Sequence, residues 1–453
     1  MLLTVEKLIY GGDGLAHLPA DAGGPGKTVF LPFVLAGEKM EASIVEQKPA
    51  FARAQSDSVI EASPHRVAAP CPYFGACGGC HYQHASYEHQ LEIKRDILLE
   101  SLRRGAKMQL SCDLQIHPSP PWNYRNRSRL QVQTNPSFAA GYFRMRSHQL
   151  LAVEECPISS PLINRCIQAM WRSGRAGKVP EGIREVEFFA NANDTRMLIE
   201  VSCSAEARRA AVRAWVEEFH ASMPEIEGVV VFRQMQSQPR TGRERSASVR
   251  LERFVVIGKD HLNYESNCAV YRVSAGSFFQ VNRFLTDELV RIVTAGQTGE
   301  VALDLYAGVG LFSTALGGDF HHTFSVESSQ TSSADLSYNL SSNGVAVQAS
   351  TEQYLARLDE PEGRVGKGSF LPPCTYKPDL AVVDPPRSGL GERVARKLAN
   401  LGAPRVVYVS CDPATLARDL VVLLAAGYRI EQVHLLDLFP QTYHLETVVH
   451  LLR

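Results

Sequence analysis

From Tyr271 onward, short apolar runs alternate with stretches of helical periodicity, and this alternation constrains the fold more than any other feature of the chain. The runs lie within VALDLYAGVGLFSTAL, TFSVESSQ, PDLAVVDPP and RVVYVSC. Each run leads into a loop and then a helix pattern, which predicts a mainly parallel sheet with helices on both faces. Because 453 residues exceed what one hydrophobic core usually holds, two or three domains are expected.

Three segments with different patterns predict a multidomain α/β protein. Residues 1–61 hold short β-rich runs between Gly, Asp and Pro, which indicate a small OB-type β-barrel. Residues 62–268 predict a mostly antiparallel α+β domain, in which a helix over residues 86–104 could pack on the C-terminal domain. In the same domain, Asn191–Asp194 would turn a hairpin, and the polar stretch Arg233–Arg250 would form a loop. Residues 269–453 form the Rossmann-like domain.

The loop after the first run of this C-terminal domain carries Gly308 and Gly310 between a strand that ends at Leu305 and a helix. These glycines let the backbone turn sharply and approach a ligand. The next run ends at Glu327, and a carboxylate there suits the two hydroxyls of a ribose. Asp-x-x-x-Gly-x-Gly plus that acid is the general pattern of S-adenosylmethionine-dependent methyltransferases. Dinucleotide dehydrogenases compete, but the loop lacks the third glycine of their GxGxxG motif.

The fourth run ends at Asp384 in VVDPPRSGL. Ligands of open α/β sheets bind beyond the carboxyl ends of the strands, so Asp384 should face the cofactor or the substrate. Methyltransferases that modify exocyclic amino groups carry an aromatic residue after Asp-Pro-Pro, where this chain has Arg387. Amino methylation is therefore disfavoured, although it stays an alternative.

Cys411 follows the last run, directly before Asp412 and Pro413. Asp412 can cap the following helix and Pro413 fits its first position. The positive end of a helix dipole lowers a thiol pKa, so this position favours a nucleophile over a small core residue.

A thiolate beside a methyl donor suits methylation at C5 of a pyrimidine. Addition of the thiolate at C6 makes C5 nucleophilic, and a base then removes the C5 proton before the thiol leaves. Glu446, which opens an apolar strand, and His444 are equal candidates for this base on the residues alone.

The chain resembles the RNA uracil-5-methyltransferases, which make 5-methyluridine in tRNA and in 23S ribosomal RNA. The matching motifs are SFFQVN (Ser277–Asn282), LDLYAGVGLFS, VVDPPRSGL, VSCDPATLARDL and DLFPQTYHLETV, in family order over the catalytic half. Residues 1–61 resemble the TRAM-type OB domain of many members. Leu311 and Ser350 depart from the pattern, since polar residues occur there in some related enzymes.

The resemblance implies a class I methyltransferase domain with Cys411 as the nucleophile and Glu446 as the base. It also implies a set of contacts to S-adenosylmethionine or to the target uracil: Gln280, Tyr306, Gly308, Gly310, Glu327 and Asp384. The implied substrate is RNA, with 23S rRNA favoured and tRNA possible. A uracil in a duplex cannot present C6, so the target should be flipped out or lie in a loop.

CPYFGACGGC places Cys71, Cys77 and Cys80 close together, and Cys156 is the candidate for a fourth metal ligand. Four cysteines suit zinc and iron–sulfur equally. The resemblance implies a structural [4Fe-4S] cluster. A non-catalytic iron–sulfur protein that binds RNA is a further alternative function. The remaining cysteines are expected to be ordinary buried thiols: Cys112, Cys166, Cys203, Cys268 and Cys374.

Basic residues alternate along two predicted strands of the central segment, so their side chains would share a face. These rows could contact phosphates and unstacked bases, or they could be solvated strand faces. They comprise Arg125, Arg127, Arg129, Arg144, Arg146 and His148, with Tyr142 and Phe143 among them.

The bulk properties exclude little. The net charge of −1 neither supports nor excludes a nucleic-acid partner. No apolar run is long enough to span a bilayer, and the N-terminal residues lack the pattern of a secretory signal. A cytoplasmic monomer is therefore expected.

Overall fold

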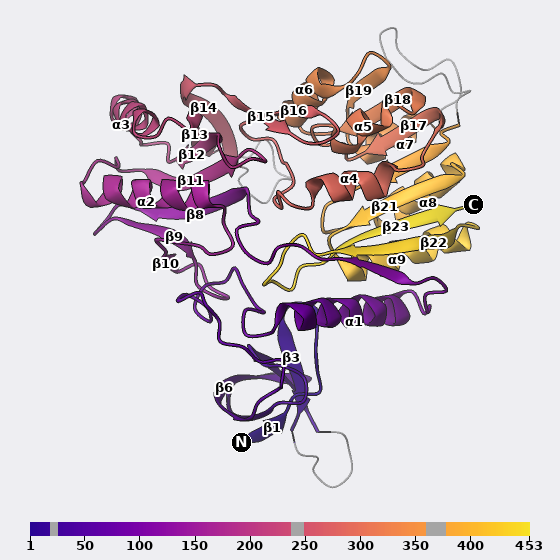
Figure 1. Ribbon diagram of the computed structural model, residues 1–453, viewed down its shortest axis with the longest axis horizontal. Coiled ribbons are helices and arrows are strands. Elements are labelled where there is room, and N and C mark those ends of the chain that lie inside the picture. Colours follow the sequence, from indigo (N-terminus) through magenta and orange to yellow (C-terminus); the bar gives the residue numbers. More distant parts are fainter. Residues whose placement is uncertain (19–25, 237–248, 359–376) are drawn as a thin grey trace, which may run out of the picture.

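The computed structural model describes residues 1–18, 26–236, 249–358 and 377–453, so Cys374 and most of the predicted loop Arg233–Arg250 lie outside it. The chain forms three lobes, each built on its own sheet (Figure 1). Helix α1 (Tyr87–Gly105) runs between the N-terminal lobe and the C-terminal sheet.

The N-terminal lobe is a curled sheet in the order β1-β5-β6-β4-β3-β2. Its strands are β1 (Leu2–Thr4), β2 (Lys7–Leu8), β3 (Asp13–His17), β4 (Thr28–Pro32), β5 (Lys39–Gln47) and β6 (Phe51–Glu61). Along β5, Met40 and Ala42 are buried and Glu41 between them is exposed. This alternation is typical of a strand with one face covered by the core. Within the described part of the lobe no strand pairing joins β1 to β2, so the expected barrel is a partly curled sheet.

The central lobe is a seven-stranded sheet with α2 (Pro161–Arg175) and α3 (Arg209–Ala221) packed on one face. The strands, in sheet order, are β10 (Leu150–Ala152), β9 (Ala139–Phe143), β8 (Arg127–Gln133), β11 (Ile183–Ala190), β12 (Met197–Cys203), β13 (Ile226–Gln236) and β14 (Val249–Gly258). The predicted hairpin β11–β12 is confirmed. Both strands extend into the predicted polar loop. Main-chain pairing continues β13 to Gln236 and begins β14 at Val249.

In the described part of the C-terminal lobe the sheet has eight strands, and among these β23 alone runs antiparallel to both of its neighbours. In sheet order the strands are β19 (Gly344–Gln348), β18 (Phe320–Glu327), β17 (Gly299–Leu305), β20 (Leu380–Val383), β21 (Arg405–Ser410), β23 (Glu446–Leu452), β22 (Arg429–Leu436) and β7 (Leu114–His117). The predicted parallel sheet is confirmed.

Helices cover both faces of this sheet, because successive strand residues point to opposite sides. Leu303 and Tyr408 belong to the core on one face, and Ala302 and Val407 to the core on the other. The first face is covered by α1, α7 (Thr351–Leu358), α8 (Gly391–Leu401) and α9 (Pro413–Ala425); the second by α4 (Thr286–Thr294) and α5 (Leu311–Leu316).

Two segments assigned to the central domain by sequence join the C-terminal lobe. Helix α1 packs on α9 so closely that a Cβ on Gly105 would lie 2.8 Å from the Ala417 side chain. Strand β7 pairs in parallel with β22, Leu114 opposite Val433. The predicted boundary after residue 268 falls within a hairpin of β15 (His261–Glu265) and β16 (Val270–Ser274).

A buried ion pair fixes α1 to the segment that precedes Glu446. Lys94 Nζ lies 2.6 Å from Asp437 Oδ1, with neither side chain exposed, and also donates to the Phe439 carbonyl at 3.0 Å. One turn earlier, Gln90 exchanges two hydrogen bonds with Gln441. Because two charges buried together are stable only as a pair, this contact sets the position of residues 437–441.

We expect Lys94→Met to lower the free energy of unfolding by about 3–5 kcal/mol, because it leaves Asp437 buried without a counter-ion. The double variant Lys94→Met/Asp437→Leu should recover most of that loss. Urea unfolding measures both, with Arg396→Met as the control, since the exposed pair Arg396–Glu392 should contribute less than about 1 kcal/mol. Equal, small losses in all three variants would contradict the role given to the buried pair.

Candidate active site

The carboxyl ends of four parallel strands meet at one edge of the C-terminal sheet. Tyr306, Asp384 and Cys411 each follow a strand directly, and Glu327 is the last residue of β18. The strand order reverses between β17 and β20, and ligands of such sheets bind at that switch point. The fold therefore brings these predicted site residues to one edge.

Glu327 holds the glycine loop after β17. Its Oε2 accepts a hydrogen bond from the Gly308 amide at 3.0 Å, and its Oε1 accepts one from the Ser329 amide at 2.6 Å. Gly308 has φ +57°, and a Cβ there would meet nothing within 4 Å, so the space above the loop is open. Tyr306 has φ +65°, a conformation that costs free energy for a residue with a side chain and is often retained at functional sites.

Asp304, at the end of β17, is a buried carboxyl that sequence reasoning did not select. Its Oδ2 accepts from the Ser313 hydroxyl, while Oδ1 has no hydrogen-bond partner in the described structure. Burial raises the pKa of Asp304 to about 7, and burial together with the charge of Asp304 raises the pKa of Asp384 to about 7. The signal was present, since Asp304 is the Asp of the Asp-x-x-x-Gly-x-Gly pattern.

Cys411 and Glu446 face one another because β21 and β23 are antiparallel. Ser410, the last residue of β21, lies opposite Thr447. Cys411 follows Ser410 and Glu446 precedes Thr447, so these two residues come opposite one another. Glu446 is 4% exposed, and burial together with Asp384 raises its pKa well above the usual range of a carboxyl. An acid and a thiol thus lie together at the ligand edge.

The prediction that the environment lowers the Cys411 pKa is wrong. Asp412 does cap α9, accepting from the Ala414 amide at 3.0 Å and the Thr415 amide at 2.9 Å. Burial, however, raises the pKa of the Cys411 thiol to about 12, with further contributions from Glu446 and Asp384. Partial charges at a helix end are weaker than full negative charges held close in a poorly solvated site.

Arg387 is the positive charge that opposes these acids, and its role was not predicted. The charge of Arg387 lowers the pKa of Cys411 and of Glu446, whereas burial and the nearby acids raise both pKa values. Its Nη2 also lies 3.3 Å from Nδ1 of His444. Burial and Arg387 lower the pKa of His444 to about 3, so this imidazole is a weak base.

The segment Ser277–Asn282 bridges the central and C-terminal lobes. The Ser277 hydroxyl donates to Asp335 Oδ2 at 2.7 Å, and its carbonyl accepts from Arg127 Nη1 at 2.6 Å. Asn282 Nδ2 donates to the Leu438 carbonyl at 3.1 Å. Gln280 is buried within this segment, and its contact with a ligand stays a prediction.

In the first row of basic residues, Arg127 and Arg129 pair with carboxylates of neighbouring strands, although the Arg129 side chain stays 54% exposed. Arg127 pairs with Glu187 and with Glu200, and its side chain is only 10% exposed. Arg129 also pairs with Glu187, at 2.7 Å. Sequence spacing sets the face on which these arginines lie, but the neighbouring strands supply carboxylates that the spacing does not reveal. In the second row, Arg146 pairs with Asp13 of the N-terminal lobe.

The four cluster cysteines line one small cavity of the central lobe: Cys71, Cys77, Cys80 and Cys156. In the ranges that the structure describes, no group of three or more His, Cys, Asp or Glu side chains is placed to hold a metal ion. Of the other cysteines, Cys166 and Cys203 are buried as expected, while Cys112 is half-buried and Cys268 is exposed.

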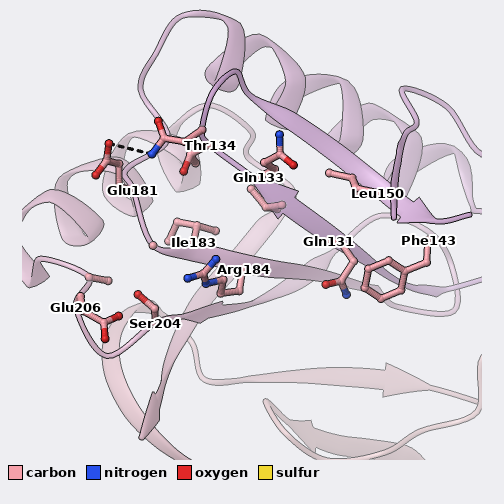
Figure 2. Close-up of a pocket in the computed structure, with 14 residues that line it drawn as sticks. Gln131, Gln133, Thr134, Phe143, Leu150, Glu181, Ile183, Arg184, Ser204 and Glu206 are labelled. Carbon is pink, nitrogen blue, oxygen red and sulfur yellow. Dashed lines mark hydrogen bonds between the residues drawn. The ribbon is translucent and has the colours of Figure 1, made fainter. Parts of the chain in front are cut away.

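A separate hollow of about 530 Å³ lies on the central sheet (Figure 2). Gln131, Arg184 and Glu206 line it together with Phe143, and no residue predicted for catalysis does so. It is therefore distinct from the strand-end site. Among the described residues, no helix is both long and apolar enough to cross a bilayer.

Residues 86–453 match the family model of the tRNA (uracil-5-)-methyltransferases. An uncharacterised RNA methyltransferase of Aquifex aeolicus is 32% identical over 98% of this chain and 97% of its own, and one of Listeria monocytogenes is 30% identical over 99% and 96%. The structure of Pyrococcus abyssi tRNA (uracil-54, C5)-methyltransferase with S-adenosyl-L-homocysteine shares the fold, with a TM-score of 0.71 at 22% identity and 100% coverage of both chains. The family model covers most of the chain, and the chain therefore belongs to the tRNA (uracil-5-)-methyltransferase family.

Proposed function

We propose that the protein transfers a methyl group from S-adenosylmethionine to C5 of a uridine in RNA, by way of a covalent bond between Cys411 Sγ and C6 of the base. The observation that carries this proposal is the placement of Cys411 opposite Glu446 at the ligand edge of the sheet. A thiol and a buried carboxyl are the two groups that methylation at a pyrimidine C5 requires from the protein.

The residues around the glycine loop fit the methyl donor. Glu327 can still accept hydrogen bonds from ribose hydroxyls, because a carboxylate has about four acceptor positions and the backbone takes only some of them. Gly308 leaves open space above the loop, and Asp304 Oδ1 is a buried acceptor without a partner. We assign Gly310, Tyr306, Gln280 and Asp384 to the same site. Bound there, S-adenosylmethionine supplies an electrophilic methyl group.

In this reaction the Cys411 thiol gives its proton to solvent water and Sγ adds to C6, so that C5 gains the electron pair that takes up the methyl group while S-adenosylhomocysteine leaves. Glu446 then accepts the C5 proton, and the bond between Sγ and C6 breaks with return of the electron pair to sulfur. Burial raises the pKa of Glu446, so its carboxylate form binds a proton more tightly than an exposed carboxylate does. Arg387 stabilises the thiolate against the neighbouring acids. The low pKa of His444 favours Glu446 over it as the base.

We propose 23S rRNA as the target, with tRNA as the alternative. The N-terminal sheet and the cysteine loop support the first, through their likeness to the TRAM-bearing iron–sulfur type described above. The name of the matching family supports the second. Methylation of either RNA would proceed through a covalent bond between the enzyme and the base. That bond would distinguish this enzyme from an exocyclic-amino methyltransferase and from a non-catalytic RNA-binding protein.

Cys411→Ala should reduce 5-methyluridine formation to background while S-adenosylmethionine binding, measured by calorimetry, is retained. The assay is nucleoside mass spectrometry of 23S rRNA and tRNA from a deletion strain that expresses each variant, and the RNA in which the modification returns is the target. Cys112→Ala is the matched control, because this half-buried thiol lies just before the start of β7, away from the carboxyl ends of the strands. Full modification by Cys411→Ala would refute the covalent route.

Glu446→Gln should slow turnover, measured as release of methylated RNA, by about 10²–10⁴-fold and should accumulate a covalent RNA–protein adduct, because the step that releases the enzyme needs the base. A denaturing gel with radiolabelled RNA detects the adduct, and His444→Gln serves as the control without accumulation. If His444→Gln accumulates the adduct and Glu446→Gln does not, the two residues exchange roles. Absence of any adduct with RNA that contains 5-fluorouridine would favour amino-group methylation.

We further propose that Cys71, Cys77, Cys80 and Cys156 hold a structural [4Fe-4S] cluster. The donor set of four thiols that line one cavity supports this assignment. The cluster would join the cysteine loop to the central sheet, where the Gly78 amide already donates to the Phe143 carbonyl.

Cys156→Ser should lose iron and melt at a lower temperature than the unchanged protein, whereas Cys203→Ser should keep its iron. Elemental analysis for iron and zinc after anaerobic purification, together with differential scanning calorimetry, measures both effects. Zinc in place of iron, or an equal metal content in the two variants, would contradict the proposal.

A further inference from the structure

A cavity of about 190 Å³ lies where the N-terminal lobe, the cysteine loop and the segment before Glu446 meet. Its walls include Gly12, Asp13 and Phe33 from the N-terminal lobe, His81 from the cysteine loop, Arg146 from the turn after β9, and Tyr443. Nothing in the reaction proposed above uses this cavity.

Aromatic rings form much of the wall. The Tyr443 ring stands edge-on to the His81 ring, with centroids 4.6 Å apart, and edge-on to the Tyr10 ring at 5.4 Å. Phe33 packs edge-on against Phe74 at 4.9 Å on the N-terminal side. Rings arranged in this way around a space are suited to stacking with an unpaired nucleobase.

Polar groups accompany the rings. Asp13 accepts hydrogen bonds from Arg146 at 2.6 Å and from Arg53 at 3.1 Å, which gives the cavity a fixed acceptor and a fixed donor.

Two glycines keep this space open. Gly11 has φ +107°, and a Cβ on it would meet nothing within 4 Å. Gly12 has φ +90°, and a Cβ on it would lie 3.0 Å from the Cβ of His81. A side chain at Gly12 would therefore displace His81 from the cavity wall.

The cavity is connected to the active site through the same rings. The Tyr10 hydroxyl donates to the Cys411 carbonyl at 3.2 Å, and the Tyr10 ring contacts the ring of Tyr443, which lines the cavity. Tyr443 also precedes His444, which contacts Arg387. A nucleotide that flanks a uridine held at Cys411 is thus within reach of the cavity.

We propose that this cavity binds one unpaired nucleobase next to the target uridine, stacked on Tyr443 and Phe33 and hydrogen-bonded to the Asp13–Arg146 pair. The proposal rests on RNA being the substrate, as proposed above. It assigns to the N-terminal lobe a part in selecting the sequence or shape around the target.

The test uses a pool of single-stranded 11-nucleotide RNAs with one central uridine and flanks randomised over A, C and G, so that the uridine fixes the register. We expect filter binding followed by sequencing to show enrichment at one flanking position with the unchanged protein. Tyr443→Leu and Phe33→Leu should each remove that enrichment, and an abasic residue at that position should weaken binding by roughly 5- to 150-fold only in the unchanged protein. Tyr338→Leu is the control, because Tyr338 is 69% exposed on α6 (Gln330–Asn339), apart from the cavity.

Methyl transfer to the central uridine, followed with tritiated S-adenosylmethionine, is measured on the same pool. Flank enrichment without methyl transfer would support the cavity and count against the proposed reaction. Enrichment that persists in both Tyr443→Leu and Phe33→Leu, or no enrichment with the unchanged protein, would overturn the cavity proposal whatever the methyl transfer shows. Two variants from different lobes guard against a local folding defect in either one.

Discussion

Strand β23 runs antiparallel between β21 and β22, and it therefore begins at the edge of the sheet where β21 ends. In an all-parallel sheet the first residue of a strand lies at the opposite edge from the ligand. The reversal brings Glu446 opposite Cys411, although 35 positions separate them in the sequence numbering. The proposed chemistry depends on this one feature of strand order.

The position of β23 in turn depends on contacts from outside the C-terminal lobe. The pair Lys94–Asp437 and the hydrogen bonds of Gln90 hold the segment that leads into β23. Tyr124 adds a hydrogen bond to the Pro440 carbonyl at 3.0 Å. Charged residues of the central lobe serve the same purpose at Ser277, where Arg127 joins the two sheets. Two residues that a basic sequence pattern would assign to RNA, Arg127 and Arg146, are thus used to join lobes.

The electrostatics of the site follow from the convergence of acids. Asp304 and Glu446 are withdrawn from water, Asp384 is half-buried beside them, and desolvation is the largest cause of the raised pKa of each. Arg387 is the cation whose influence opposes them at Cys411. Such surroundings favour the protonated thiol, so the proposed reaction requires that Cys411 lose its proton before it adds to the base. This differs from the simple expectation of a thiolate stabilised by a helix end.

Local sequence determined the parallel strands, the glycine loop, the acid at the end of β18 and the cap of α9, because each depends on periodicity or on neighbours a few residues away. It also placed Cys411 and Asp384 at strand ends, and therefore at the ligand edge. Only the tertiary structure placed β7 in the C-terminal sheet, paired Arg127 with Glu187, raised the pKa of Cys411 and brought Tyr10 to its carbonyl. These features depend on which groups from distant parts of the chain share a poorly solvated space, and sequence spacing carries no record of those neighbours.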